Sequence, residues 1–335
     1  MIGRCRLSQG SQTSRLYDPQ EAQAFYEARY EHGYMEDYSA EAKQRLAELI
    51  RSLDLPAEGS ALDFGCGNGV LTEVLRDALP HWQICGAEIS SIAISNARAR
   101  FPGCTFLAFD DAALQRQRFD LVFSHHVLEH VSDLRETIAG LAAYAKPTAA
   151  MLHVLPCGNE GSLEFRLCTL RNDGIDRDRE GRFFFEDEGH LRRLTTKKLS
   201  AVLAEHGFML RQDYYTNHFY GALDWITNWD ASFLRSLTDL SKANDVPSGL
   251  KLAGLRSLFV GMSLCRRHAH FCRRLLAREG KSPKHLLALG VALPVYPLSA
   301  MLESLLRSGK RREWTKRRRD PRGSEMLLYF ARPGD

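Results

Sequence analysis

Several common signals are missing from this chain. The eight cysteines are scattered, none forms a Cys-x-x-Cys pair, and no zinc-ligand pattern is present. These absences argue against a disulfide framework and predict reduced thiols and no metal ion in a cytoplasmic protein. The first sixteen residues are polar and lack the apolar segment of a secretory signal, so residues 1–16 are predicted to be a disordered start.

The net charge is small, but the charged residues are distributed unevenly along the chain. The 335 residues carry a formal charge of only +4, and 44% of them are apolar, which is enough for a sizeable core. Residues 246–335 contain 19 Lys and Arg against 6 Asp and Glu, a net of +13, whereas the rest of the chain has a net of −9. A basic region of this kind is typical of proteins that meet nucleic acid, phospholipid or a phosphorylated substrate.

Apolar strands alternate with helical segments through the first half of the chain. Strand patterns occur at 60–65, 82–90, 104–110, 119–127 and 149–156, separated by helical patterns at 70–79, 91–101 and 133–145, the last with Ser132 in position to cap it. Such alternation predicts an α/β fold, a Rossmann-like doubly wound and mostly parallel sheet covered on both faces. We expect 17–216 to form the main domain, with 157–195 as an inserted segment and 217–335 as a helical appendage.

The stretch ALDFGCGNGV (61–70) carries the strongest local signal. A strand ending in an acid, a glycine-rich turn and a helix make the first unit of a nucleotide-binding sheet. Glycines permit positive φ and let a ligand lie against the backbone. The spacing is not the G-x-G-x-x-G of dinucleotide sites, which disfavours a nicotinamide dehydrogenase.

Acids end the next two predicted strands. Glu88 stands nineteen residues after Gly69, where an acid can accept both hydroxyls of an adenosine ribose. Asp110 and Asp111 end the third strand, and one of them is expected to accept from an adenine amino group, with Asp111, followed by Ala112, preferred. Each acid alone is better explained as a solvated turn residue or a helix cap. Acids at three successive strand ends that face one crevice nevertheless favour a binding site.

Together with FDLVFSHHVLEHV (119–131), these residues resemble the class I S-adenosylmethionine-dependent methyltransferases, closest to the branch with the ubiquinone-biosynthesis and small-molecule enzymes. The resemblance covers roughly 40–216 and implies a seven-stranded sheet with S-adenosyl-L-methionine as the cofactor. It implies a binding set formed by Asp63, Gly65, Cys66, Gly67, Asn68, Gly69, Glu88, Ile89, Asp110, Asp111, Ala112, Ser124 and His125. Asp120 is read as structural.

Methyl transfer needs a base only where the acceptor is a poor nucleophile. Histidines cluster near the strand ends, and His126 and His153 are the predicted catalytic residues, with His190 weaker. In an extended segment His125 and His126 would face opposite ways, so one of them at most would meet the substrate. The aromatic residues of 25–38 predict either a helix packed on the sheet edge or a lid over the cofactor.

The tail contains seventeen uncharged residues, 286–302, interrupted by Pro294 and Pro297 and flanked on both sides by Lys and Arg. Basic flanks at both ends favour a shallow interfacial segment over a membrane span. We therefore expect 252–319 to bind an anionic membrane surface. The alternative is a soluble helical cap. Nucleic acid is not an expected partner because aromatic residues are too few, and the sequence does not predict the oligomeric state.

Three functional hypotheses follow. The leading one is a methyltransferase, peripheral on the inner face of the plasma membrane, that modifies a lipid, quinone-precursor or lipid-linked glycan acceptor. The second keeps the enzyme but gives it a soluble small-molecule acceptor, with the C-terminal region as a substrate lid. The third is a non-catalytic, cofactor-binding scaffold.

Overall fold

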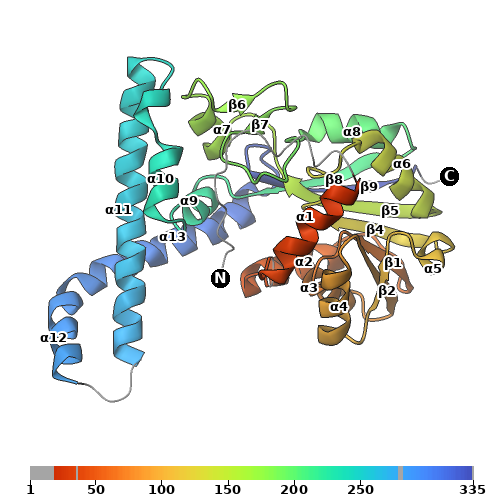
Figure 1. Cartoon of the computed structure of the whole chain (residues 1–335), viewed down its shortest axis with the longest axis horizontal. Helices are drawn as coiled ribbons and strands as arrows, with labels where there is room; N and C mark the ends of the chain where they lie inside the picture. The colour runs from red at the N-terminus through yellow and green to blue at the C-terminus, as the bar shows by residue number, and fades with distance from the viewer. Residues whose placement is uncertain (1–18, 35–36, 278–281, 334–335) are drawn as a thin grey trace. The chain divides into compact units, whose positions relative to one another are not determined.

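The computed structural model describes residues 19–34, 37–277 and 282–333. The chain divides into two compact units (Figure 1). The sheet unit comprises 1–157, 186–213 and 326–335, and the helical unit comprises 158–185 and 214–325. Residues 158–185 of the predicted inserted segment thus share one unit with most of the predicted appendage, whereas 186–195 and 326–335 belong to the sheet unit. The predicted disordered start, 1–16, lies outside the described residues.

A seven-stranded sheet forms the first unit, in the order β3-β2-β1-β4-β5-β9-β8. The β1–β2, β2–β3, β1–β4 and β4–β5 pairs are parallel, which confirms the predicted α/β class. The strands are β1 (Gly59–Phe64), β2 (Trp82–Glu88), β3 (Thr105–Ala108), β4 (Phe119–His125), β5 (Ala145–Pro156), β8 (Met209–Thr216) and β9 (Glu325–Ala331).

Helices cover both faces of this sheet. α2 (Ala40–Arg51), α3 (Val70–Ala78) and α4 (Ser91–Arg100) lie on one side, and α6 (Leu134–Tyr144) and α8 (Thr196–Ala204) lie on the other (Figure 1). α1 (Pro19–Glu31) precedes them, and α5 (Ala112–Gln115) follows β3. The N-cap of α6 is Asp133, not the predicted Ser132, because the Asp133 carboxylate accepts a hydrogen bond from the Glu136 amide.

Strand order fixes where a ligand can bind. The chain runs from β1 outward through β2 to β3 and then returns to the other side of β1 with β4. Ligands of open α/β sheets bind at this reversal, beyond the carboxyl ends of the strands. Phe64 and His125, which end β1 and β4, therefore mark the edge at which the site is expected.

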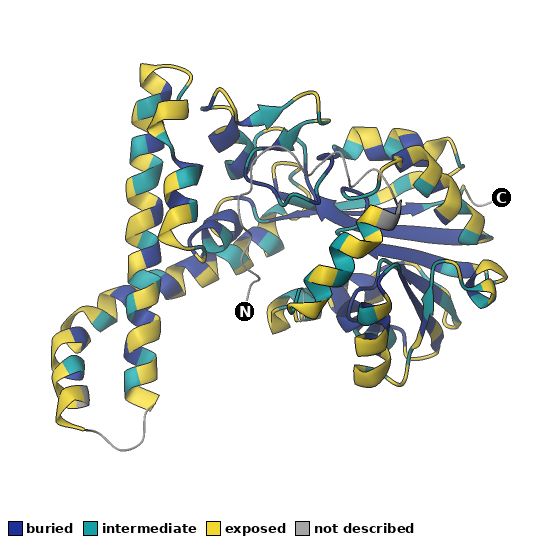
Figure 2. Ribbon diagram, viewed as in Figure 1, coloured by how far each residue is buried: buried dark blue, intermediate teal, exposed yellow. Residues whose placement is uncertain are grey.

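The helical unit has its own core. It contains α7 (Leu163–Cys168), a two-stranded sheet of β6 (Ile175–Asp176) and β7 (Arg182–Phe183), α9 (Tyr220–Ile226), α10 (Ala231–Leu237), η2 (Leu240–Lys242), α11 (Val246–Ala277), α12 (Pro283–Ala292), η3 (Leu293–Val295) and α13 (Tyr296–Arg317). Phe183, Leu223 and Phe259 are among the buried side chains that join these elements. Burial along α11 to α13 is much sparser than in the sheet (Figure 2).

Candidate functional site

The turn after β1 admits only glycine at three positions. Gly65, Gly67 and Gly69 have φ of 74°, 53° and 77°, a region that residues with a Cβ rarely adopt. A Cβ on Gly65 would lie 2.5 Å from a Val127 methyl, and one on Gly69 would lie 2.8 Å from the Phe106 ring. The backbone is thus held close to the loop after β4, and the Gly65 and Cys66 amides donate to the Ala87 carbonyl. Gly69 is the N-cap of α3, whose first amides have no acceptor within the helix.

Glu88 joins the second strand to this turn. Its Oε2 accepts a hydrogen bond from the Gly67 amide at 2.9 Å, and its Oε1 accepts from the Ile89 amide at 2.8 Å and the Ser90 amide at 3.2 Å. Burial raises the pKa of Glu88, although these backbone donors oppose the change. The structure therefore brings Gly67, Glu88 and Ile89 together at the carboxyl ends of β1 and β2, as the sequence predicted.

Asp63 and Asn68 form hydrogen bonds next to the glycine turn. The Thr72 hydroxyl donates to Asp63 Oδ2 at 2.6 Å, and burial is the main reason that the pKa of Asp63 rises to about 7. Asn68 donates to the Tyr34 carbonyl at 3.1 Å and accepts from the Asn96 amide at 3.1 Å. Cys66 is buried, and burial raises the pKa of its thiol.

The two acids that follow β3 are more exposed than Glu88. Asp111 caps α5, with Oδ1 accepting from the Ala113 amide at 2.8 Å. Asp110 and Ala112 are exposed. Because capping uses only Oδ1 of Asp111, the assignment of an adenine contact to Asp111 remains compatible with its position and stays a prediction.

The two predicted catalytic histidines, His126 and His153, differ in their exposure to solvent. His153 has no exposed surface, and its Nδ1 lies 2.8 Å from the Ser124 hydroxyl, which is also buried. Burial lowers the pKa of His153 to about 3. His153 therefore holds Ser124 within the sheet and, in this structure, offers no surface for a substrate to reach.

The expectation that His125 and His126 face opposite ways is wrong. His126 has a φ of 53°, so the strand ends before it. The two rings lie with their centroids 4.5 Å apart and tilted by 34°. The prediction failed because the rule of alternating faces holds only in extended backbone, and a left-handed residue turns the second side chain back beside the first. Such a conformation costs energy and is typical of functional sites.

A buried carboxylate stands behind His126. Glu129 is 1% exposed, and its Oε1 lies 3.1 Å from His126 Nδ1. Among the described residues, neither carboxylate oxygen has a hydrogen-bond partner of good alignment. Burial alone would raise the pKa of Glu129, but His126, His130 and His190 outweigh it and hold this pKa at about 2. Glu129 is therefore an anion within a ring of imidazoles.

His130 and His190 complete this cluster. His130 Nδ1 lies 2.8 Å from the Gly189 carbonyl oxygen, and burial, reinforced by His190, lowers the pKa of His130 to about 4. Ligand atoms of Glu129, His130 and His190 all lie within 4.8 Å of one another. These three side chains are of the kinds that bind a transition metal, although the sequence had predicted no metal.

Helix α1 lies against the glycine turn. The Tyr30 hydroxyl is 2.8 Å from the place that a Cβ on Gly67 would occupy. Arg29 makes a two-pronged ion pair with Asp187, in which Nη1 donates to Oδ1 at 2.7 Å. Tyr26 stacks edge-on against His130 with ring centroids 5.8 Å apart. The aromatic segment thus borders both the turn and the histidine cluster, which is the position expected of a lid.

The donor set fits S-adenosyl-L-methionine. The glycine turn leads into the first amides of α3, and Glu88 provides a buried carboxylate nineteen residues after Gly69. Asp63, Gly65, Gly67 and Gly69 would hold the amino-acid end, and Glu88 the ribose. The site therefore has the groups that an adenosyl cofactor with a charged amino-acid end requires.

Sequence reasoning did not select Glu129 or Tyr30 as site residues. Glu129 was visible as a lone acid in the apolar run VLEHV, three residues after His126. The contact between Glu129 and His126 depends on the left-handed conformation of His126, which no local sequence pattern predicts. Tyr30 was visible only as one of several aromatic residues at helical spacing.

Comparison with known proteins identifies the family. A family model described as a methyltransferase domain matches residues 31–213, more than half of the chain. Trans-aconitate 2-methyltransferase of Variovorax paradoxus (strain S110) is 30% identical over 125 residues, 37% of this chain. The same enzyme of Escherichia coli (strain K12 / DH10B) is 29% identical over 120 residues, 36% of this chain.

These matches are partial. The chain spans about half the length of either relative, 48% in both cases. Among solved structures, a putative methyltransferase from Bacillus halodurans C-125 is 14% identical, with a TM-score of 0.46, and the match covers 87% of this chain and 100% of that one.

Proposed function

The chain belongs to the family of S-adenosylmethionine-dependent methyltransferase domains, and on that premise we propose that it methylates a hydroxyl group of a soluble small molecule. The observation that carries the proposal is the pairing of His126 with the buried Glu129 anion, whose Oε1 lies 3.1 Å from His126 Nδ1. A hydroxyl is a poor nucleophile and benefits from a positioned base, whereas better nucleophiles need none.

His126 and Glu129 divide the proton chemistry. His126, whose side chain is 26% exposed, accepts the hydroxyl proton at Nε2. The Glu129 anion beside Nδ1 stabilises the imidazolium that results and fixes the orientation of the ring. S-adenosylmethionine, when bound, supplies an already activated methyl group, so the remaining task of the protein is to orient the acceptor and exclude water.

A carboxylate acceptor is the second candidate. The two relatives named above are trans-aconitate 2-methyltransferases, and a carboxylate can be methylated without a base. Their small soluble acceptor favours a soluble acceptor here over the lipid or glycan acceptor expected from the tail. The role of the C-terminal region as a substrate lid stays a prediction.

The test is transfer of a radiolabelled methyl group from S-adenosylmethionine into a small-molecule extract that also contains the lipid fraction. We expect label in a water-soluble product that survives mild alkali, because an ether resists hydrolysis whereas a methyl ester releases volatile methanol. Alkali-labile label would support the carboxylate candidate, and label in the lipid fraction would support a lipid acceptor. Cofactor binding without any transfer would support the scaffold hypothesis.

A chelator separates base catalysis from metal catalysis in the same assay. If His126 acts as a base, transfer should continue in EDTA. Loss of transfer in EDTA, with recovery on adding a divalent cation, would instead assign Glu129, His130 and His190 to a metal. Glu129→Gln, which removes the anion beside His126, should lower transfer, whereas the matched control Glu205→Gln, which changes an exposed acid beside α8, should not.

A further inference from the structure

Polar contacts hold the long helices of the helical unit together. We call α11, α12, η3 and α13 the helical arm. Arg273 of α11 donates to Glu303 of α13 at 2.5 Å and 3.1 Å, and Arg307 pairs with the same carboxylate. His268 Nδ1 lies 2.9 Å from the Ser299 hydroxyl. Ion pairs and hydroxyls thus lie between these helices, beside buried apolar side chains such as Phe259 and Leu306.

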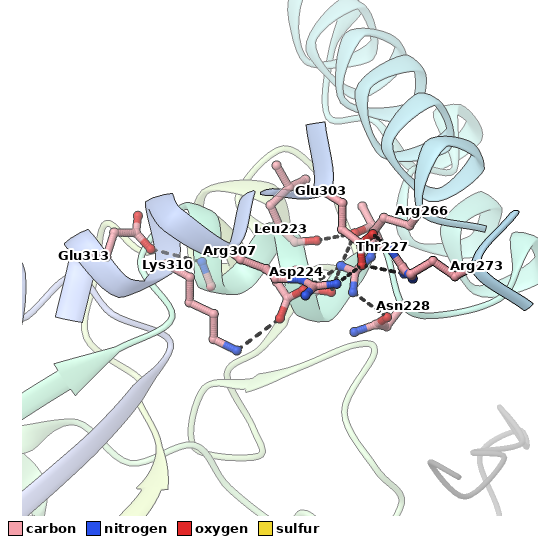
Figure 3. A network of polar contacts seen from close by, with 11 residues as sticks. Leu223, Asp224, Thr227, Asn228, Arg266, Arg273, Glu303, Arg307, Lys310 and Glu313 are labelled. Atoms are coloured by element: carbon pink, nitrogen blue, oxygen red, sulfur yellow. Dashed lines mark hydrogen bonds and ion pairs between the residues drawn. The ribbon is translucent and has the colours of Figure 1, made fainter. Parts of the chain in front are cut away.

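Further polar contacts join the arm to α9 (Figure 3). Asp224 forms ion pairs with Arg266 of α11 at 2.7 Å and with Lys310 of α13 at 3.1 Å. Glu313 is buried and accepts hydrogen bonds from the backbone amides of Phe219, Tyr220 and Gly221. These contacts fix how the helices of this unit pack, and so they fix which side chains point outward.

The outward side chains are predominantly apolar. Leu287 is 71% exposed and Val291 is 74% exposed, values that leave most of each side chain in contact with solvent. The other large apolar side chains that the arm exposes are Val246, Leu250, Leu258, Val260, Leu264, Phe271, Leu276, Leu286, Leu293, Val295, Leu298, Met301 and Leu305. Apolar surface on this scale marks an interaction site with another protein or a membrane.

The charge on the same surface has one sign. α11 and α12 contain no Asp or Glu, and the two acids of α13, Glu303 and Glu313, are both buried. Exposed Lys and Arg remain along all three helices, among them Lys251, Arg267, Arg274, Lys284, Arg311 and Arg312. A second copy of this chain would present the same positive surface, which disfavours self-association. An anionic lipid surface is complementary in both charge and polarity.

Length and composition alone would let the helical stretch Leu286–Arg317 cross a membrane, since its most apolar window has a mean hydropathy of 1.6 and is only 22% buried. Three observations favour binding along the surface instead. Pro294 and Pro297 interrupt the stretch, Glu303 lies within it, and basic residues flank both ends. Basic flanks favour keeping both ends of the stretch on the same side of the membrane. A helix that lies in the interface, with Lys and Arg beside its apolar face, is compatible with the prolines, with Glu303 and with the basic flanks.

We propose that the helical arm, residues 246–277 and 283–317, docks on the surface of an anionic lipid bilayer, with its exposed Leu, Val and Met side chains in the interfacial layer and its Lys and Arg side chains on the phosphates. The large exposed apolar surface suits a surrounding that is itself partly apolar. This docking is independent of which acceptor the enzyme methylates.

The experiment is flotation of the full chain with two kinds of vesicle, pure phosphatidylcholine and a mixture with phosphatidylglycerol. We expect the protein to float with the anionic vesicles and to do so at least tenfold less with the neutral ones. The triple variant L287Q/V291Q/L298Q should lower the partition coefficient on anionic vesicles at least tenfold. R311E/R312E should lower it about tenfold or more, because each basic residue near the surface contributes roughly one kcal/mol.

Matched controls use exposed residues of the sheet unit. Met209→Gln replaces an apolar side chain that is 48% exposed, and Lys197→Glu reverses an exposed charge; neither should change flotation. Titration with S-adenosylhomocysteine verifies that each variant is folded. Folded wild-type protein that stays with neither vesicle, or an unchanged partition of the triple variant, would overturn the proposal. Concentration-dependent dimerisation that the triple variant abolishes, without vesicle binding, would assign the surface to a second copy.

Discussion

The sheet unit and the helical arm differ in how much apolar surface they leave exposed. In the sheet unit, Leu62, Phe106 and Phe123 are at most 1% exposed, and the buried acids Asp63, Glu88 and Glu129 gather at one edge of the sheet. In the helical arm, Glu303 and Glu313 are buried while Leu287 and Val291 stand outside. A few buried acids in an apolar core mark a site, whereas a large exposed apolar surface marks an interaction surface.

The largest effect is expected in the sheet unit, at the proposed general base His126. His126→Ala should lower kcat by about 10²- to 10⁴-fold, the range for loss of a general base, with little change in affinity for S-adenosylhomocysteine. His206→Ala, a half-buried histidine after α8 and away from the β4 edge, is the control. Steady-state kinetics with the acceptor found in the labelling assay measure the effect. An unchanged kcat would remove His126 from the chemistry.

The next effect compares apolar residues in the two regions directly. Phe106→Ala, within the cluster of Cys66, Ile94 and Ala97, should cost about 3–5 kcal/mol of unfolding free energy because it leaves a cavity. Leu287→Ser should change that free energy by less than about 0.5 kcal/mol because the side chain is already exposed. Urea unfolding monitored by circular dichroism measures both. A large loss for Leu287→Ser would mean that the arm hides this residue in solution.

Cofactor affinity tests the buried acid at the end of β2. Glu88→Gln keeps the shape but weakens acceptance from the Gly67 amide and from the cofactor hydroxyls. We expect about a tenfold or greater loss of affinity for S-adenosylhomocysteine by titration calorimetry, since hydrogen bonds to charged groups contribute roughly 1.5–3 kcal/mol. Asp77→Asn, an exposed acid on α3, should bind normally. Equal affinities would remove Glu88 from the cofactor site.

A buried acid of the helical arm should behave as a structural group. Glu313→Gln leaves the amides of Phe219, Tyr220 and Gly221 with a weaker acceptor and should cost about 1–2 kcal/mol of unfolding free energy. Affinity for S-adenosylhomocysteine should not change. Thr315→Ala, an exposed neighbour, provides the baseline in the same urea titration. A variant as stable as the wild type would show that the arm does not depend on the Glu313 carboxylate.

The last prediction concerns pH and Asp63. Burial raises the pKa of Asp63 from 3.8 to about 7, so between about pH 4 and pH 7 the folded state binds more protons than the unfolded state. The stability from this group is fully present below the unfolded pKa and is lost as pH rises through about 7. Asp63→Asn should flatten this part of the stability curve in cofactor-free protein. An identical slope in both proteins would contradict the raised pKa.

The sheet and the glycine turn could be predicted because local patterns determine them. A strand, a turn with three glycines and a helix with an apolar face are each legible from a few neighbouring residues, as in 61–78. The same locality explains why Gly67 and Glu88 were found: their meeting follows from the parallel pairing of β1 and β2. The methyltransferase family itself was also predicted correctly, although its ubiquinone branch was not confirmed.

Other features depend on contacts between residues far apart in the chain. Residues 324–333 alternate poorly because β9 lies inside the sheet, where Met326, Leu328 and Phe330 have no exposed surface and Leu327 and Tyr329 have little. A strand buried on both faces carries no period-two pattern. Likewise, the pairing of 158–185 with 214–325 in one unit rests on a shared core that no local signal announces.

The position of β9 bears on how the protein forms during synthesis. β9 lies between β5 and β8, yet it is translated after every other strand of the sheet and after the entire helical arm. Until it emerges from the ribosome, β5 and β8 lack their common neighbour and present open edges, which are prone to mispairing. The basic, apolar arm emerges before β9. A nascent chain therefore exposes the surface of the arm before its sheet is complete.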